Sequence, residues 1–248
     1  MPKFQIASDI HIESNEQRVI DTLKPVAEYL ILAGDIGQPV DSNYHTFFQY
    51  VTSNWKKVIY VPGNHEYYDT TGIMTINRTN LMIEDMAEKY DNLYYLNNGQ
   101  VQIDDITIIG SVLWSSPEYK DKLTDFRMNI FDDEGCITLD RFKNLNRECI
   151  EYLEKTLNNI DDERKVIVIT HFLPLMKTEI PNSKFENDPE IDSYLGNKLY
   201  HLINKANIWV SGHTHEKFDF NYKGTRWMCN AYGQLFEKIP YKDMTFTL

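Results

Sequence analysis

The chain has 248 residues, 42% of them hydrophobic, and a formal net charge of −12 with a pI near 5.0. This acidic balance argues against a broad basic surface that would grip duplex nucleic acid by its backbone, and no run approaches the roughly 18 uncharged apolar residues of a membrane helix. Because the amino terminus opens into strand-like sequence rather than a signal peptide, we expect a cytoplasmic protein with one domain over residues 1–248 and no membrane partner.

Short β-type runs alternate with polar or helical stretches along the chain, which indicates an α/β protein. Six mostly continuous apolar runs are typical of strands that are covered on both faces. In chain order they are Phe4–Ala7, Tyr29–Ala33, Val58–Val61, Ile106–Val112, Val166–Thr170 and Ile208–Ser211. Helices are predicted where apolar residues recur three and four positions apart, at Tyr44–Trp55, Met74–Tyr90 and Leu139–Leu157.

Two regions depart from this alternation. The stretch Trp114–Leu139 mixes aromatic and charged residues without a clear period, and we interpret it as a long excursion over one edge of the fold. Toward the carboxyl end, Phe218–Tyr222 and Arg226–Cys229 flank the turn residues Lys223 and Gly224. This pattern predicts a hairpin and, with it, a second and more antiparallel sheet.

Polar clusters follow the ends of five of these apolar runs. They are Asp9-Ile10-His11, Gly34-Asp35, Gly63-Asn64-His65-Glu66, His171 and Gly212-His213-Thr214-His215. If the strands are parallel, these side chains gather at one crest of the sheet, where open α/β folds build their sites. Carboxylates, imidazoles and an amide oxygen are ligands that divalent cations accept. The clusters together therefore predict a metal site at the strand ends.

No cluster is specific by itself, because an Asp-x-His or a Gly-Asp pair usually forms an ordinary turn. In Asp9-x-His11 and His213-x-His215, alternate residues of an extended segment can point the same way and hold one ion. The ordered set carries the prediction, since independent turns have no reason to supply complementary ligands after five strands. His45 lies on a predicted helix and receives no role.

In this order, the clusters resemble the signature blocks of the calcineurin-like metallophosphoesterase superfamily across nearly the whole chain. Gly110–Trp114, Met128-Asn129 and the Arg226-x-x-x-Asn230 stretch are similar to a bacterial-type subgroup. The chain departs from that subgroup in Thr-His-Phe-Leu-Pro around His171 and in Asn-Ala-Tyr-Gly-Gln near its end, and neither departure removes a metal ligand. The resemblance implies a four-layer α/β/β/α sandwich of two mixed β-sheets flanked by helices, with a dinuclear metal site at the strand ends.

By that resemblance, two divalent ions would be bound, with Asp35 bridging them. The first ion would be held by Asp9, His11 and His215. The second would be held by Asn64, His171 and His213. Mn²⁺ is the first choice, and Fe, Zn²⁺, Ni²⁺ and Co²⁺ accept the same mixed nitrogen and oxygen ligands.

The reaction that this resemblance implies is hydrolysis of a phosphate ester, with a phosphodiester favoured, by in-line attack of a metal-bridging hydroxide. Asp35 and His65 would be the catalytic residues, and His65 would stabilise charge or protonate the leaving oxygen. Glu66 could orient His65, although a surface glutamate is the simpler interpretation. A small phosphate ester, with nucleotides among the candidates, is the expected substrate. Its candidate contacts are Asn64, Arg127, Asn129 and Tyr232.

Three alternatives remain open from the sequence. A phosphomonoesterase or protein-phosphatase-like hydrolase would use the same metal core. A scaffold module that keeps the fold but has lost catalysis would be marked by missing ligands, and all seven are present. A nuclease acting on long DNA is disfavoured by the acidic composition and the short length, while short oligonucleotides stay possible substrates.

Overall fold

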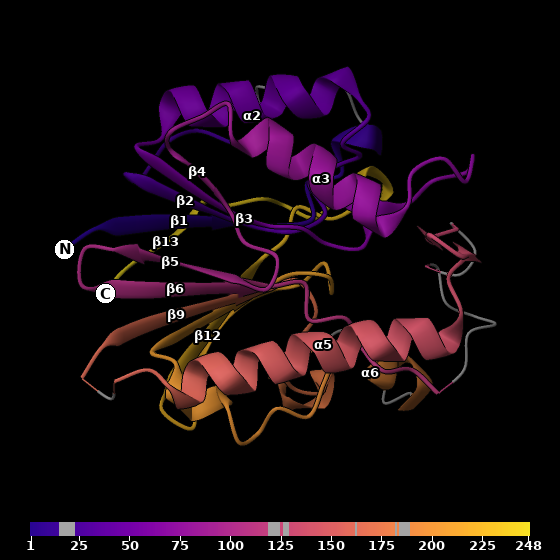
Figure 1. The fold of residues 1–248 in the computed structure, drawn as a ribbon. Helices are drawn as coiled ribbons and strands as arrows, with labels where there is room; N and C mark the ends of the chain where they lie inside the picture. Colours follow the sequence, from indigo (N-terminus) through magenta and orange to yellow (C-terminus); the bar gives the residue numbers. More distant parts are fainter. Residues whose placement is uncertain (15–22, 119–124, 126–128, 162, 182, 184–188) are drawn as a thin grey trace.

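A computed structural model describes the chain except for residues 15–22, 119–124, 126–128, 162, 182 and 184–188. Two mixed β-sheets stack face to face in its centre, and helices cover both outer faces (Figure 1). This arrangement confirms the four-layer α/β/β/α sandwich. Among the helices that are described, none combines the length and the apolar character needed to cross a membrane.

The first sheet has the strand order β13-β1-β2-β3-β4. Its strands are β1 (Lys3–Ala7), β2 (Tyr29–Ala33), β3 (Lys57–Val61), β4 (Leu93–Tyr95) and β13 (Met244–Thr247). The four strands β1 to β4 are parallel, and β13 is antiparallel to β1. The helices α2 (Ser42–Asn54) and α3 (Ile76–Ala87) cover its outer face (Figure 1).

The second sheet has the strand order β11-β12-β10-β9-β6-β5. Its strands are β5 (Gly99–Ile103), β6 (Ile106–Ser111), β9 (Lys165–Thr170), β10 (Ile208–Ser211), β11 (Lys217–Tyr222) and β12 (Thr225–Asn230). Strands β6, β9, β10 and β12 are parallel, while β5 and β11 are antiparallel edges. The outer face of this sheet is covered by α5 (Leu139–Asn158) and the short α6 (Pro189–Leu195), and β7 (Phe131–Asp132) pairs with β8 (Gly135–Cys136) apart from both sheets.

Alternation of side chains along the strands explains why these runs are apolar throughout. In β9, Ile167 and Ile169 face the layer between the two sheets, whereas Val166 and Val168 face the layer beneath α5. In β3, Ile59 belongs to the layer between the sheets, and the residues on either side of it face α2 and α3. A strand between two apolar layers needs apolar side chains in both directions, so its sequence loses the period of two.

The structure corrects the expected topology in one respect. The strands that carry the five polar clusters are divided between the two sheets, with β1, β2 and β3 in the first and β9 and β10 in the second. The carboxyl ends of both parallel sets point to the same side of the sandwich, so the clusters still meet. The hairpin of β11 and β12 is confirmed, and it extends the second sheet, which also contains parallel strands.

Candidate metal centre

Five of the predicted ligands have a left-handed backbone, with φ values of 54° at Asp9, 51° at His11, 55° at Asp35, 68° at His213 and 52° at His215. Non-glycine residues adopt this conformation rarely, and it persists where the surrounding structure over-determines it. Here neighbouring turns hold one another: the Asp9 N–H donates to Gly34 O at 2.9 Å, and the His11 N–H donates to Asp35 O at 3.1 Å. The strained residues therefore collect where the strand ends meet.

Glycine is required at two of these turns because the segments approach closely. A β-carbon added at Gly34, whose φ is +86°, would lie 2.3 Å from His171 Nδ1. One added at Gly63 would lie 2.2 Å from Asp35 Oδ1. Both distances are far shorter than any normal non-bonded contact. These glycines therefore let the side chains of two predicted ligands occupy the space between the loops.

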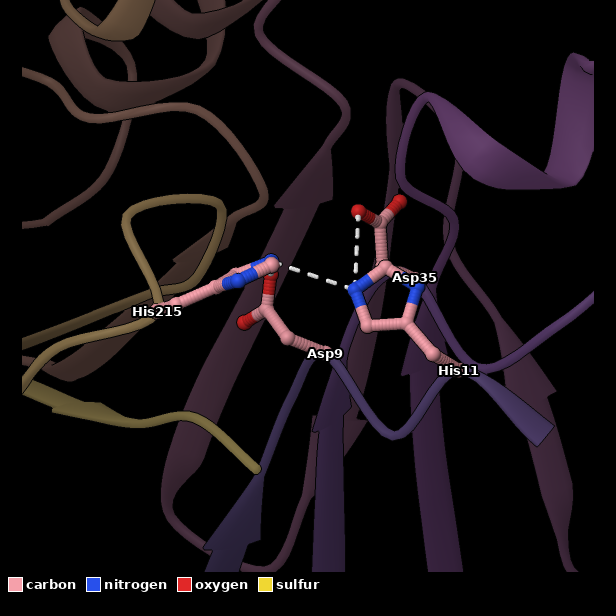
Figure 2. Close-up of side chains that lie close together, drawn as sticks. All are labelled: Asp9, His11, Asp35 and His215. Carbon is pink, nitrogen blue, oxygen red and sulfur yellow. Dashed lines mark hydrogen bonds and ion pairs between the residues drawn. The ribbon is translucent and has the colours of Figure 1, made fainter. Parts of the chain in front are cut away.

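The first group of potential ligands consists of Asp9, His11, Asp35 and His215, whose side chains converge in Figure 2. Their ligand atoms all lie within 4.8 Å of one another. His11 Nε2 is 3.1 Å from His215 Nε2 and 3.9 Å from Asp35 Oδ2, and His215 Nε2 is 3.5 Å from Asp9 Oδ1. The geometry thus brings together the three residues predicted for the first ion and the residue predicted to bridge.

The second group lies on the other side of the same aspartate. Asp35, His171 and His213 have ligand atoms within 4.8 Å of one another. His171 Nε2 is 3.3 Å from Asp35 Oδ1 and 2.9 Å from Asn64 Oδ1. The two oxygens of Asp35 therefore face different groups, Oδ2 the first and Oδ1 the second. A bridging ligand requires this division.

Unpaired polar atoms test whether the residues fit a cation. Asp9 Oδ2 and His213 Nε2 are buried without a hydrogen-bond partner, although buried polar atoms are nearly always paired. In His11 and His215, Nδ1 is bonded to a glutamate, so their Nε2 lone pairs are left to approach each other. Convergent lone pairs, an orphaned carboxylate oxygen and the absence of thiolate from this donor set fit a borderline or hard divalent cation.

Two glutamates that the sequence interpretation missed lie behind these histidines. Glu13 Oε1 is 3.0 Å from His11 Nδ1, and Glu237 Oε2 bonds to His215 Nδ1. Carboxylates in this position fix the tautomer and orientation of a ligating imidazole. Glu13 could have been found from its spacing, since it continues the alternation of Asp9 and His11. Glu237 could not, because it comes from a distant 3-10 turn (Leu235–Glu237).

Asn64 is fixed by a third missed residue, Asp125. The buried Asn64 amide donates to Asp125 Oδ1 at 2.8 Å and to the Tyr68 hydroxyl at 2.7 Å, while Tyr68 donates to the same Asp125 oxygen at 2.8 Å. Since the amide nitrogen is bonded on this side, Asn64 Oδ1 faces His171. Asp125 belongs to the stretch that the sequence interpretation treated as an excursion, and its partner is 61 residues away.

Glu66 is not the surface residue that the sequence suggested, because it is 2% exposed. Its carboxylate accepts the backbone N–H groups of Asp35 at 3.1 Å, Ile36 at 2.7 Å and Gly63 at 2.7 Å. These donors belong to the loops that follow β2 and β3. Glu66 thus joins the loops that carry Asp35 and Asn64.

The charges of the cluster shift several pKa values. Burial opposes ionisation of Asp35, but the nearby His171 and His65 outweigh it and hold the pKa of Asp35 well below its usual range. Burial lowers the pKa of His65 and of His171, yet the charge of Asp35 prevails and raises each to about 9. Burial, reinforced by the charge of His171, instead lowers the pKa of His213 well below its usual range. In the metal-free protein the centre therefore combines an ionised aspartate with protonated imidazoles.

His65 lies at the edge of the centre. Its Nε2 is 3.9 Å from Asp35 Oδ2, and its Nδ1 is 3.1 Å from Glu13 Oε1. The ring contacts that of Tyr68, with 4.3 Å between centroids. The side chain is 19% exposed, similar to the 18% of His215, so a molecule arriving from solvent can reach it.

The predicted substrate contacts remain predictions. Arg127 lies outside the described residues. Asn129 has a left-handed φ of 56°, and its carbonyl accepts the Asp69 N–H at 3.3 Å, close to the turn that carries His65. Tyr232 stacks on Tyr241 with 3.7 Å between ring centroids, an arrangement that supports a packing role.

Comparisons with known proteins agree with this architecture. The model of a family described as calcineurin-like phosphoesterase matches residues 2–217, a range that contains all seven predicted metal ligands. An uncharacterized protein of Acanthamoeba polyphaga mimivirus is 32% identical over 234 residues, covering 88% of this chain and 82% of that protein. The crystal structure of phosphopantetheinyl hydrolase from Mycobacterium tuberculosis superposes with a TM-score of 0.73 at 21% identity, covering 99% of this chain and 95% of that one. This structural likeness establishes a shared fold.

Proposed function

Because this chain belongs to the calcineurin-like phosphoesterase family, we propose that it is a metal-dependent hydrolase of a phosphate ester, with a phosphodiester as the favoured substrate. The observation that carries the proposal is the orientation of the Asp35 carboxylate: its Oδ2 faces one group of ligands and its Oδ1 faces the other. Two divalent cations, when bound, supply the positive charge that activates water and offsets the charge on phosphate oxygens.

Seven side chains of this protein would hold those ions. We propose Mn²⁺ first, and the mixed nitrogen and oxygen donors also accept Fe, Zn²⁺, Ni²⁺ and Co²⁺. Asp9, His11 and His215 would bind one ion, Asn64, His171 and His213 the other, and Asp35 both.

His65 is suited to deliver a proton to the departing oxygen. Its Nδ1 is bonded to Glu13, and its Nε2 faces the centre. Of the two histidines that contact this glutamate, His65 is the more exposed. A positioned proton donor typically contributes about 10²–10⁴-fold to turnover.

A hydrolysis screen tests the proposal. Protein loaded with Mn²⁺ is assayed against matched mono- and diesters, including nitrophenyl and alkyl members and a phosphopantetheinyl ester, the group named for the structural neighbour. We expect turnover that is abolished by a chelator and is faster on diesters. Faster turnover of monoesters would overturn the diester preference. If the protein binds two ions and hydrolyses none of the esters, the proposal of a hydrolase is overturned and a scaffold role is favoured.

His65→Ala refines the test. The variant should keep both ions, and it should lose about 10²–10⁴-fold in turnover on an alkyl ester but much less on a nitrophenyl ester, which leaves readily as its anion. Equal losses on both esters would indicate that His65 stabilises phosphoryl charge instead. Wild-type rates on both would remove it from the mechanism.

A further inference from the structure

Glu13 contacts two histidines that have different expected tasks. Its Oε1 lies 3.0 Å from Nδ1 of His11, a proposed metal ligand, and 3.1 Å from Nδ1 of His65, the proposed proton donor. The rings of these histidines meet edge to face, with 4.3 Å between centroids and an interplanar angle of 72°. One carboxylate oxygen therefore anchors both rings on the side that faces away from the centre.

The position of Glu13 is set by backbone contacts of the residues on both sides of it. The His11 and Ile12 N–H groups donate to Asp35 O at 3.1 Å and Ile36 O at 3.0 Å, and the Ser14 N–H donates back to His11 O at 3.0 Å. Gly37 permits this approach, since a β-carbon there would lie 2.4 Å from Ile12 Cγ1 and 3.4 Å from Glu13 Oε2. The turn that carries Glu13 is thus held against the loop that carries Asp35, and its side chain is only 15% exposed.

The shared bond determines which ring atoms face the centre. With Nδ1–H donated to Glu13, the Nε2 of His11 points to His215 at 3.1 Å, and the Nε2 of His65 points to Asp35 Oδ2 at 3.9 Å. Glu237 makes a comparable bond to Nδ1 of His215, a ligand of the same proposed ion as His11. A charged acceptor strengthens such bonds and preserves the tautomer of the imidazole.

We propose that Glu13 is a positioning residue shared by the metal centre and the proton donor, holding the His11 Nε2 toward the first ion and the His65 Nε2 toward the leaving group. The part that concerns His65 rests on the proposed function. The part that concerns His11 rests on the geometry of the metal centre alone. Loss of Glu13 should therefore weaken metal binding and proton delivery together.

The experiment uses the full chain in five forms: wild type, Glu13→Ala, Glu13→Gln, His65→Ala and the double variant Glu13→Ala/His65→Ala. Glu28→Gln is the matched control, because Glu28 is 56% exposed and pairs with Lys56 on the surface. Mn²⁺ is titrated calorimetrically into metal-free protein, which requires no turnover. Nitrogen-15 spectra of histidine-labelled, Zn²⁺-loaded protein report the Nδ1–H groups, and turnover is measured at saturating Mn²⁺.

Substitution of an anchor behind a metal ligand typically weakens metal binding by about 10–100-fold, and we expect this range for one of two Mn²⁺ equivalents in Glu13→Ala. The Nδ1–H signals of His11 and His65 should shift together, while that of His171, which donates to Ala33 O at 2.9 Å, should stay in place. Turnover of an alkyl ester should fall more than that of a nitrophenyl ester. On the His65→Ala background, Glu13→Ala should add no further loss at saturating metal.

Several results would overturn the proposal. Unchanged Mn²⁺ affinity and unchanged Nδ1–H signals in Glu13→Ala would show that the contacts do not position the rings. Loss of a whole Mn²⁺ equivalent in both Glu13→Ala and Glu13→Gln would make Glu13 a ligand instead. If Glu13→Ala does not fold, Glu13→Gln, which keeps the shape and loses the charge, must show the same shifts at smaller amplitude. If no ester is hydrolysed by wild type, the proposed function fails, while the titration and the spectra still decide the role of Glu13 at His11.

Discussion

Replacing Glu66 with alanine should destabilise the metal-free protein at pH 5 by about 3–9 kcal/mol, because three buried backbone N–H groups lose their acceptor and each costs about 1–3 kcal/mol when left unpaired. The donors are those of Asp35, Ile36 and Gly63, at 2.7–3.1 Å. They come from two loops, so no local rearrangement of one loop restores all three bonds. Glu66→Gln should lose less, about 1–3 kcal/mol, since one amide oxygen can still accept the two N–H groups that now bond to Oε2.

The size of this effect should depend on pH, and the sign follows from the pKa of Glu66. Burial, followed by the charge of Asp35, raises that pKa from 4.5 to about 7. A raised folded-state pKa adds stability below pH 4.5 that is lost as pH rises toward 7, on the order of 3 kcal/mol for a shift of this size. Wild type should lose this contribution between pH 5 and 8, whereas Glu66→Ala has no such contribution to lose. The difference between the two proteins should therefore shrink as pH rises.

Urea unfolding of the metal-free proteins at pH 5 and pH 8 measures both effects. Glu84→Ala is the control, because Glu84 is an exposed glutamate on α3 and should change stability by no more than about 0.5 kcal/mol. If the free energy of unfolding of Glu66→Ala is within about 1 kcal/mol of wild type at pH 5, Glu66 does not hold the two loops together as argued. A difference that grows from pH 5 to pH 8 would refute the argument about the buried charge.

Three further changes probe the centre itself. Asp35→Ala should reduce tightly bound metal from two equivalents to one or fewer, because its two oxygens face both ligand groups, and elemental analysis that still finds two would contradict the bridge. Asp125→Ala should weaken binding of one metal equivalent by about 10–100-fold, because the Asn64 amide then keeps only its bond to Tyr68, and should lower stability by about 1–3 kcal/mol, because the buried Tyr68 O–H loses its acceptor. Calorimetry and thermal unfolding check these two effects. Metal binding at pH 8 should release a proton from His171, because the pKa of this residue is raised to about 9 without metal. Metal affinity should therefore rise with pH up to about that value. A binding enthalpy that does not depend on the ionisation enthalpy of the buffer would contradict this.

The sequence could predict where the central strands end, but it could not predict which of the two sheets contains each strand. Central strands such as β3 and β9 are apolar in every position because both of their faces are covered, and that signal is strong. The edge strands β4, β5 and β13 were missed because they are short or partly exposed; β5, for example, alternates exposed glutamines with buried or half-buried residues. Periodicity reports whether a strand is covered. It carries no information about which of two stacked sheets contains the strand.

The candidate ligands could be predicted because each cluster combines suitable donors within a few residues. The residues behind them could not, since Glu237 and Asp125 become recognisable only when distant segments meet His215 and Asn64. Glu66 shows the same limit in another form: a glutamate after Asn64 and His65 is unremarkable in sequence, and only the approach of the loop after β2 makes it a buried acceptor.

The distribution of charge explains how an acidic chain with a net charge of −12 can receive an anionic substrate. Four carboxylates bond to or converge with the histidines of the centre, namely those of Asp9, Glu13, Asp35 and Glu237. Two divalent cations would offset these four charges, and His65, when protonated, would add a positive charge at the edge that an incoming phosphate can reach. An aspartate in place of Asn64 would add a fifth negative charge beside Asp35, whereas the amide offers the same oxygen geometry without that charge. The neutral ligand at position 64 therefore keeps one further negative charge out of a centre that has to bind two cations and a phosphate.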